Sequence, residues 1–263
     1  MKPSACARGA GGRWRDIPLS RENDPFYEEM VRNGLYSNRR NLRHFLEMVF
    51  GEVKCDGRRV LDIGGGAGLL SFCAVHLGAS RAVLLEPEAA GSSKGFIRRF
   101  EEAADALALR ERVVLRPVTF QEFDPRGERF DLALSHSSIN HLDEEACVSL
   151  RESSDARETY LGLLRRLRSM LNPGADVVVC DCSRHNLFGH LGLRNPFAPS
   201  VEWHKHQSPS LWANLFCQAG FERPVVRWNT FNSLGAPGRM LLGNRAASYF
   251  LVSHFRLSVV NPA

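Results

Sequence analysis

The stretch VLDIGGGAGLLSF, residues 60–72, decides the fold of this chain. Three glycines at alternate positions, Gly64, Gly66 and Gly68, separate an apolar strand pattern from an apolar helical pattern. A strand that turns through glycines into a helix presents backbone N–H groups and a helix N-terminus to a ligand at the carboxyl edge of a sheet. Glycine suits the turn because a Cβ would keep a nucleoside-bearing ligand away from the backbone. The stretch therefore predicts a nucleotide-type site.

Short β-branched runs alternate with helical patterns around this turn, which indicates βαβ units and a mostly parallel sheet. We expect strands at Arg59–Ile63, Arg81–Leu85, Val113–Val118, Phe130–Ser135 and Ala175–Asp181, and closing strands at Pro224–Thr230 and Ala247–Leu257. Between the fourth and fifth strands, an apolar stripe at helical spacing ends at Asn172-Pro173-Gly174. The predicted class is α/β, with a seven-stranded, mostly parallel sheet, an antiparallel last strand, helices on both faces and an N-terminal helical arm.

Three regions are expected along the chain. Residues 1–20 have no helical or strand period, and we predict a disordered arm. Residues 21–55 predict a helical lid, with one helix capped by Asp24-Pro25 and a second beginning near Ser37. Residues 56–263 form the main domain, and the irregular segment 183–207 within it is predicted to roof a site, because unstructured segments of this length are uncommon elsewhere.

Composition narrows the class of protein. A chain of 263 residues with 44% hydrophobic and 24% charged residues fits one globular α/β domain. No apolar run approaches the roughly 18 residues that cross a bilayer, and the N-terminus lacks the apolar region of a secretory signal. Seven scattered cysteines favour a reducing compartment. We therefore expect a cytoplasmic protein without membrane contact.

The basic excess is concentrated near the N-terminus. The net charge is +5, and residues 1–45 hold nine Lys and Arg against five Asp and Glu. Such an arm either attracts RNA or phosphorylated substrates or is only a solvated surface.

The spacing of the glycines separates three classes of ligand. A Walker A loop needs Gly-Lys-Ser/Thr at the end of the turn, whereas Gly68 is followed by Leu69-Leu70. The dinucleotide fingerprint that starts at Gly64 would require glycine at position 69. The run Asp62-x-Gly-x-Gly-x-Gly instead resembles motif I of class I S-adenosylmethionine-dependent methyltransferases.

Three further markers follow in the order that this family shows. Glu86-Pro87 ends the second strand, FDLALSHSSINHLDEE resembles motif IV, and NPGADVVVCD resembles the turn before the fifth strand. The resemblance covers roughly residues 59–181 and implies a Rossmann-like domain. Its cofactor would be S-adenosyl-L-methionine, with S-adenosyl-L-homocysteine as product.

The resemblance also implies a cofactor site. Asp62 would meet the methionine portion directly or through water, and the Glu86 carboxylate would accept both ribose hydroxyls, although it would serve NAD equally well. The segment after the third strand would flank the adenine, but an acidic residue often found there is missing. The cofactor candidates are Asp62, Ile63, Gly64, Gly65, Gly66, Gly68, Glu86, Pro87, Thr119, Phe120, Ser135 and His136.

The candidate base is His141, because it follows the fourth strand at the edge where the methyl group should lie. It could instead be a histidine satisfied by Asp143 or Glu144. The candidates for acceptor binding are Tyr27 and Tyr36, which could equally be packing residues, and Arg184, His185, Trp203, His204 and His206 in the roof segment. No metal site is expected, because no paired carboxylates accompany the histidines.

The function predicted is in-line transfer of a methyl group to a small-molecule acceptor, at a hydroxyl of a sugar or secondary metabolite. A rival hypothesis is an RNA or protein methyltransferase that uses the basic arm, although no nucleic-acid module is recognised. A second rival is an NAD-dependent oxidoreductase, and a third is a cofactor-binding scaffold without catalysis. Ser135-His136-Ser137-Ser138 stands where amino-methylating enzymes carry Asn/Asp-Pro-Pro-Tyr, which disfavours bases or glutamine as acceptors. The acceptor and the oligomeric state stay open.

Overall fold

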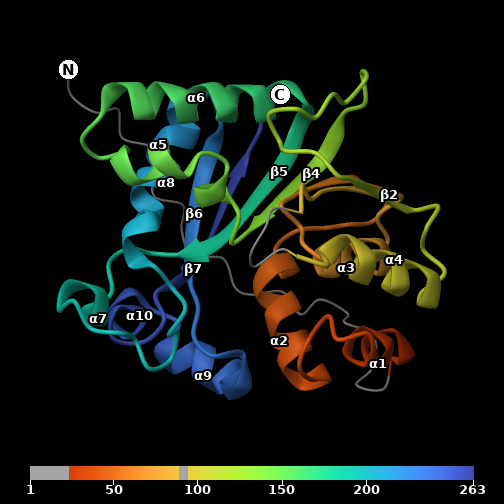
Figure 1. Cartoon of the computed structure of the whole chain (residues 1–263), viewed down its shortest axis with the longest axis horizontal. Helices are drawn as coiled ribbons and strands as arrows, with labels where there is room; N and C mark the ends of the chain where they lie inside the picture. Colours follow the sequence, from red (N-terminus) through yellow and green to blue (C-terminus); the bar gives the residue numbers. More distant parts are fainter. Residues whose placement is uncertain (1–23, 89–93) are drawn as a thin grey trace.

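A computed structural model describes residues 24–88 and 94–263, and the predicted arm at residues 1–20 lies outside them. Its centre is a seven-stranded sheet with the order β3-β2-β1-β4-β5-β7-β6 (Figure 1). The strands are β1 (Arg59–Ile63), β2 (Arg81–Leu85), β3 (Val113–Arg116), β4 (Phe130–His136), β5 (Leu171–Cys182), β6 (Glu222–Trp228) and β7 (His254–Val260). β1 to β5 pair in parallel, and β7 is antiparallel to β5 and β6. The predicted fold class is confirmed.

Helices cover both faces of the sheet and create two hydrophobic cores (Figure 1). One face carries α1 (Pro25–Arg32), α2 (Arg39–Phe50), α3 (Leu69–His76) and α4 (Phe96–Ala106), and the other carries α5 (Glu144–Ser149), α6 (Ser154–Ser169) and α8 (Pro209–Gln218). Side chains alternate between the two faces along a strand. Thus Val177 and Val179 of β5 join the core under α6 and α8, and Val178 and Cys180 join the core under α2 and α3.

The N-terminal helices begin where the sequence predicted. Asp24 caps α1 by accepting a hydrogen bond from the Phe26 N–H at 3.0 Å, and Pro25 follows at the first helical position. Asn38 caps α2 by accepting from the Asn41 N–H at 2.9 Å. The apolar face of α2 is buried beside α3, so this predicted arm packs against the main sheet.

Two strand predictions need correction. The run Ala247–Leu257 is not one strand, because α9 (Gly235–Leu242) and α10 (Arg245–Phe250) separate β6 from β7. Asn244 caps α10 by accepting a hydrogen bond from the Ala247 N–H. A short apolar run such as the one that follows fits a strand as well as a helix, so the sequence pattern alone did not reveal this helix. β5 begins at Leu171 rather than Ala175, and its first residues pair irregularly with β4, which accommodates Pro173 and Gly174.

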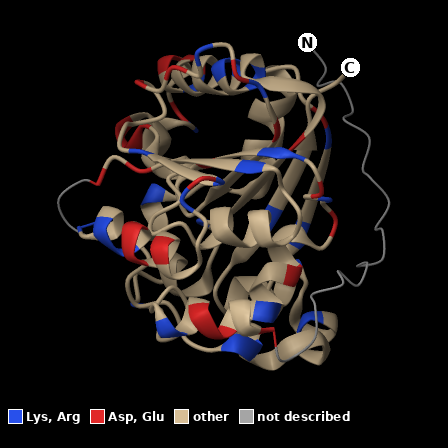
Figure 2. Cartoon of the chain, turned by 90° about the vertical axis from the view of Figure 1, so that its right-hand side faces the viewer, with Lys and Arg blue, Asp and Glu red and all other residues tan. Residues whose placement is uncertain are grey.

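The irregular segment 183–207 contains short helices of its own. These are α7 (Leu187–His190) and the 3-10 turn η2 (Trp203–Lys205), and two further 3-10 turns, η1 (Ile139–His141) and η3 (Asn232–Leu234), lie elsewhere. Among the described residues, no helix is both long and apolar enough to cross a bilayer. Acidic and basic residues are interspersed along the ribbon on the side of the molecule that Figure 2 shows.

The glycine turn is required by the packing of the protein itself. The backbone φ values of Gly64, Gly66 and Gly68 are +65°, +58° and +89°. Residues that carry a Cβ adopt such positive φ values only at an energetic cost. At Gly65, an added Cβ would overlap Leu84 Cδ1 and the Asp62 carboxylate. The turn therefore lies directly on the tips of β1 and β2. This close packing requires glycine, whether or not a ligand also approaches the turn.

We predict that Gly65→Ala lowers the free energy of unfolding by about 1–3 kcal/mol, because the methyl group overpacks a buried contact. Gly162→Ala is the matched control. Gly162 lies in α6 with open space around it, and alanine there should stabilise the chain by about 0.5–1 kcal/mol. Urea unfolding at constant pH measures both, and a Gly65→Ala variant as stable as the wild type would contradict the packing argument.

Candidate active site

The end of β2 is tied to the glycine turn by a buried carboxylate. Glu86 Oε2 accepts a hydrogen bond from the Gly66 N–H at 3.0 Å, and Glu86 Oε1 accepts from the Glu88 N–H at 3.1 Å. A carboxylate offers about four lone-pair sites, so each oxygen can still accept from a hydroxyl group. Glu86 is thus positioned to hold a diol at the edge of the sheet.

Asp62, at the end of β1, is fully buried under the same turn. Its Oδ2 accepts from the Ser71 hydroxyl at 2.8 Å, whereas Oδ1 has no hydrogen-bond partner within the described residues. Burial raises the pKa of Asp62 to about 6, against the effect of the hydrogen bonds from Ser71. An unsatisfied buried oxygen costs about 1–3 kcal/mol. This acceptor suits a ligand that brings a cationic or N–H group.

Two cavities meet at the glycine turn. The first, of about 420 Å³, is lined by Glu86, Pro87, Thr119 and Phe120. The second, of about 520 Å³, lies under α2. Both share the lining residues Gly64, Phe96 and Ser137, so together they form one groove along the carboxyl edge of the sheet. A diol acceptor and an apolar wall along this groove, with the unsatisfied Asp62 carboxylate buried beneath the glycine turn, fit an adenosyl ligand that carries an amino-acid tail.

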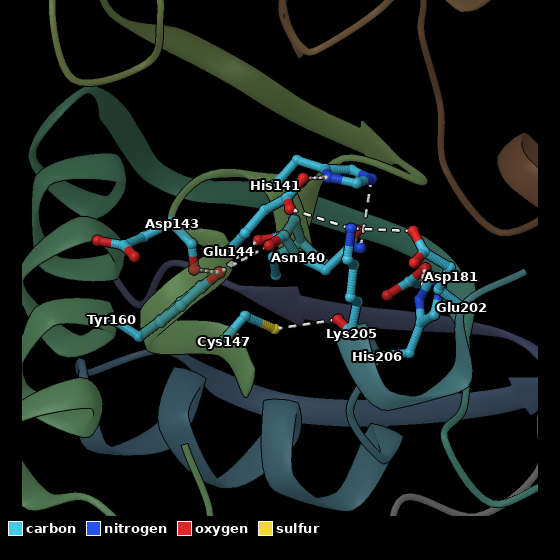
Figure 3. A network of polar contacts seen from close by, with 11 residues as sticks. Asn140, His141, Asp143, Glu144, Cys147, Tyr160, Asp181, Glu202, Lys205 and His206 are labelled. Carbon is cyan, nitrogen blue, oxygen red and sulfur yellow. Dashed lines mark hydrogen bonds and ion pairs between the residues drawn. The ribbon is translucent and has the colours of Figure 1, made fainter. Parts of the chain in front are cut away.

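His141 lies in the first cavity, on the same side as Glu86. Its Nδ1 is 2.5 Å from Glu144 Oε1, and Lys205 Nζ is 3.4 Å from the other oxygen of Glu144 (Figure 3). Lys205 also pairs with Glu202 at 2.9 Å, so this network fastens the η2 segment to α5. The sequence left open whether His141 is a base or a histidine whose hydrogen bonding is satisfied by Asp143 or Glu144, and the contact with Glu144 fits the second alternative.

The second cavity ends at three side chains from neighbouring strands: His136 of β4, Asp181 of β5 and His254 of β7. Asp181 is buried, and its Oδ1 lies 3.0 Å from His206 Nδ1 of the roof segment (Figure 3). Its Oδ2 has no hydrogen-bond partner in the described part of the chain. The buried carboxylate therefore has hydrogen-bonding capacity that the described residues do not use.

Helix α2 and the segment after β6 close the second cavity from two sides. Tyr36, Phe45 and Met48 line it from the N-terminal region, and Asn229 and Asn232 line it from the segment after β6. The Asn232 Nδ2 donates to the Tyr36 hydroxyl at 3.0 Å, which joins the two walls.

The other predicted site residues are spread over several places. Tyr36 and His136 line the second cavity, but Tyr27 packs in the core against His76. Ser135 lies behind the lining, where its hydroxyl contacts the Ser138 hydroxyl at 2.8 Å. The roof residues also separate: His206 meets Asp181, His185 lines a different cavity, Arg184 bonds to Gln207, Trp203 packs over Gly189, and His204 is exposed.

Sequence reasoning missed Asp181, His254, Asn229 and Asn232 as site residues. Asp181 had a usable signal, since it is an acidic residue at the carboxyl end of a buried strand. His254 had none, because its position depends on where β7 begins and on antiparallel pairing with Cys182.

Both cavity histidines of the sheet are kept neutral. Burial, and to a smaller extent the proximity of His254, lower the pKa of His136 to about 4, and Asp181 partly opposes this. Burial also lowers the pKa of His254, again against the effect of Asp181. The cavity therefore holds one carboxylate among uncharged imidazoles near neutral pH.

We predict that His136 makes the chain less stable as pH falls from about 6.5 to about 4. In this window the unfolded histidine takes up a proton and the folded one does not, which removes up to about 3 kcal/mol from the free energy of unfolding. His136→Gln should flatten that part of the stability–pH curve, as measured by urea unfolding. The exposed His204→Gln is the control, and a His136→Gln curve parallel to the wild type would refute the assignment.

Comparison with known proteins identifies the family to which this chain belongs. The model of a family described as "Methyltransferase domain" matches residues 35–225, which is more than half of the chain. A ubiquinone biosynthesis O-methyltransferase of Azorhizobium caulinodans is 28% identical over 266 aligned residues, which cover 96% of this chain and 93% of that protein.

Solved structures share the fold. An S-adenosylmethionine-dependent methyltransferase from Mesorhizobium loti has a TM-score of 0.53 at 16% identity, covering 79% of this chain and 92% of that one. The S-adenosylmethionine-dependent methyltransferase SibL has a TM-score of 0.54 at 16% identity, covering 96% of this chain and 64% of that one. The groove, the fold and the family match agree: the chain belongs to the methyltransferase domain family, and it is an S-adenosylmethionine-dependent methyltransferase.

Proposed function

We propose that this enzyme methylates a hydroxyl group of a small-molecule acceptor bound in the second cavity. The observation that carries the proposal is the buried Asp181, a lining residue of that cavity: His206 holds its Oδ1, and its Oδ2 has no hydrogen-bond partner among the described residues. A cavity of about 520 Å³ suits a small molecule. The name of the Azorhizobium caulinodans relative, an O-methyltransferase, points to the same class of acceptor atom.

For the cofactor, we propose that Glu86 accepts the ribose hydroxyls and that Thr119 and Phe120 flank the adenine. Their support is the shared lining of the first cavity. Asp62 would receive the ammonium end through its unsatisfied Oδ1. S-adenosylmethionine supplies an electrophilic methyl group together with its leaving group, so the chain has to position the acceptor, exclude water and take up one proton.

The proton is assigned to the Asp181–His206 pair. An acceptor hydroxyl that donates to Asp181 Oδ2 becomes more nucleophilic, and its proton passes to the pair as the oxygen is methylated. His206 orients the carboxylate from the other side, at 3.0 Å. The low pKa of His136, about 4, makes that imidazole a weak base, so we propose an orienting contact for it.

The base proposed here is therefore Asp181 and not His141, which was the candidate from the sequence. His141 shares its cavity with Glu86 and is paired with Glu144, whereas Asp181 lies in the neighbouring cavity, where the acceptor is proposed to bind. Helix α2 and the turn before it would act as the lid over that acceptor, with Phe45 and Met48 of α2 and Tyr36 of the turn as contact residues.

The nature of the acceptor is tested with labelled methyl groups. The purified chain is incubated with labelled S-adenosylmethionine and an extract of the source cells, and the products are separated into small molecules, RNA and protein. Label should appear in the small-molecule fraction. Label confined to RNA or protein would support the rival hypothesis in which the basic N-terminal residues recruit a macromolecule.

We predict that Glu86→Ala abolishes the thermal stabilisation by S-adenosylhomocysteine, because the diol loses its two acceptor oxygens. At a ligand concentration of 100 times Kd the wild type should gain about 2.7 kcal/mol. Glu102→Ala removes an exposed carboxylate of α4 and should keep the full shift in Tm. NAD should stabilise neither protein, and an undiminished shift in Glu86→Ala would overturn the role given to Glu86.

We predict that Asp181→Asn lowers kcat by about 10²-fold or more for a hydroxyl acceptor, because the asparagine amide cannot accept the proton of the hydroxyl group. Binding of S-adenosylhomocysteine should be unchanged. The deficit should shrink for acceptors with a more acidic hydroxyl, a dependence that a purely structural role would not produce.

His141→Gln serves as the competing variant, and the exposed His204→Gln is the control. A loss of kcat in His141→Gln that equals or exceeds the loss in Asp181→Asn would restore His141 as the base. A loss in Asp181→Asn that is independent of the acidity of the acceptor would refute the proton-accepting role of Asp181.

A further inference from the structure

A third cavity lies outside the active groove, between α7, the N-terminus of α8 and α10. Its volume is about 740 Å³. Ser183 and Trp228 line it, whereas Asp181 and Asn229 line the active cavity, and the two cavities share no lining residue. Figure 1 shows α7 and α10 side by side at this end of the molecule, and the Tyr249 hydroxyl lies 3.1 Å from His190 Nδ1 between them.

The wall of the third cavity has an apolar part and a basic part. Val226, Trp228, Tyr249 and Phe250 provide aromatic and aliphatic surface. His185, His190 and Arg245 provide nitrogen donors. A ligand that fills this cavity therefore needs an apolar body and a group that accepts hydrogen bonds.

The basic part continues into an adjoining pocket of about 350 Å³. The two share His185, Ser208 and Ser210, and the smaller pocket adds Arg151 and Arg157. None of the three arginines of these pockets, Arg151, Arg157 and Arg245, forms an ion pair with a carboxylate among residues 24–88 and 94–263. Arg157 donates instead to the Leu150 and Arg151 carbonyls, each at 2.8 Å.

The wall of the third cavity contains no acidic residue, although Glu152 and Asp155 lie beside Arg151 and Arg157 in the sequence. No Asp or Glu occurs in residues 183–201 or in residues 223–263, which supply α7, α10 and most of the cavity wall. The pKa of His185 is lowered first by burial and then by the charges of His190, Arg151, Arg184 and Arg245. Cationic groups that repel one another gain stability when an anion binds between them.

The N-terminus of α8 adds to the same field. Ser208 caps this ten-residue helix, and the hydroxyls of Ser208 and Ser210 lie 3.0 Å apart at the junction of the two pockets. Pro209 has no N–H and the Leu211 N–H is bonded to Ser208 Oγ, so the contribution of α8 is the positive end of its helix dipole, which favours an oxyanion.

We propose that this composite cavity is a binding site for a phosphate ester with an apolar or aromatic body. The phosphate would lie between Arg151, Arg245 and the start of α8, and the body would lie against Trp228 and Tyr249. A phosphate monoester matches the site better than a carboxylate, because it brings up to two negative charges and three acceptor oxygens to several arginine and histidine donors. The site is separate from the methyl-transfer cavity, so its occupation does not depend on the acceptor proposed above.

Calorimetric titration of the full chain with phenyl phosphate tests the proposal. Phenyl phosphate should bind more tightly than inorganic phosphate, benzoate should bind more weakly, and phenol should show no measurable binding. Affinity for phenyl phosphate should fall as salt is raised. Saturation with S-adenosylhomocysteine should leave it unchanged, whereas competition would place the phosphate in the cofactor groove and overturn the assignment.

Variants locate the site. Arg245→Gln and Arg151→Gln each remove a charged donor from an exposed position and should raise the Kd for phenyl phosphate about tenfold. Arg40→Gln, an exposed arginine on α2, makes the same change of charge away from the cavity and should bind as the wild type does. Equal Tm values establish that the variants are folded. The proposal fails if the two cavity variants bind phenyl phosphate as tightly as Arg40→Gln, or if phenol binds as tightly as phenyl phosphate.

Discussion

The close contact between the glycine turn and the tips of β1 and β2 is the constraint on which the groove depends. Glu86 accepts the Gly66 N–H, and Gly65 leaves room for Leu84 and for the Asp62 carboxylate beneath it. One set of glycines thus satisfies the packing of the protein and leaves the backbone accessible at the edge of the sheet. The two carboxylates of the cofactor half are held at fixed positions because this contact is rigid.

The acceptor half of the groove is made by a different part of the fold. β7 inserts antiparallel between β5 and β6, and its first residue, His254, pairs with Cys182 of β5 beside Asp181. This places an imidazole from the end of the chain next to a carboxylate that lies about 70 residues earlier. Burial lowers the pKa of both His254 and His136, and Asp181 beside them contacts His206.

Polar networks hold two segments near the carboxyl edge of the sheet, residues 203–207 and the end of α2. Lys205 joins Glu144 and Glu202, and the Gln207 amide donates to the Cys147 carbonyl at 2.6 Å, so the roof segment is fixed to α5. On the opposite side, the fully buried Arg256 of β7 donates to the Val49 carbonyl at 3.1 Å and pairs with Glu52, which anchors the end of α2 to the last strand. Residues 203–207 are therefore connected to α5, and the end of α2 to β7, by buried or partly buried hydrogen bonds, which are costly to break.

The sequence alone determined the parallel strands, the glycine turn and the acidic tip at Glu86. Each of these is a local pattern: a run of apolar residues, a spacing of glycines, or one charged residue at the end of a strand. For the same reason, the caps at Asp24 and Asn38 follow from neighbouring residues. Only the tertiary structure decided which polar groups share a cavity. It separated His141 from Asp181, sent His185 and His206 of one segment to different cavities, and brought His254 to the groove. Those outcomes depend on strand order, antiparallel register and burial, which act between residues far apart in the chain and leave no mark in any short stretch of it.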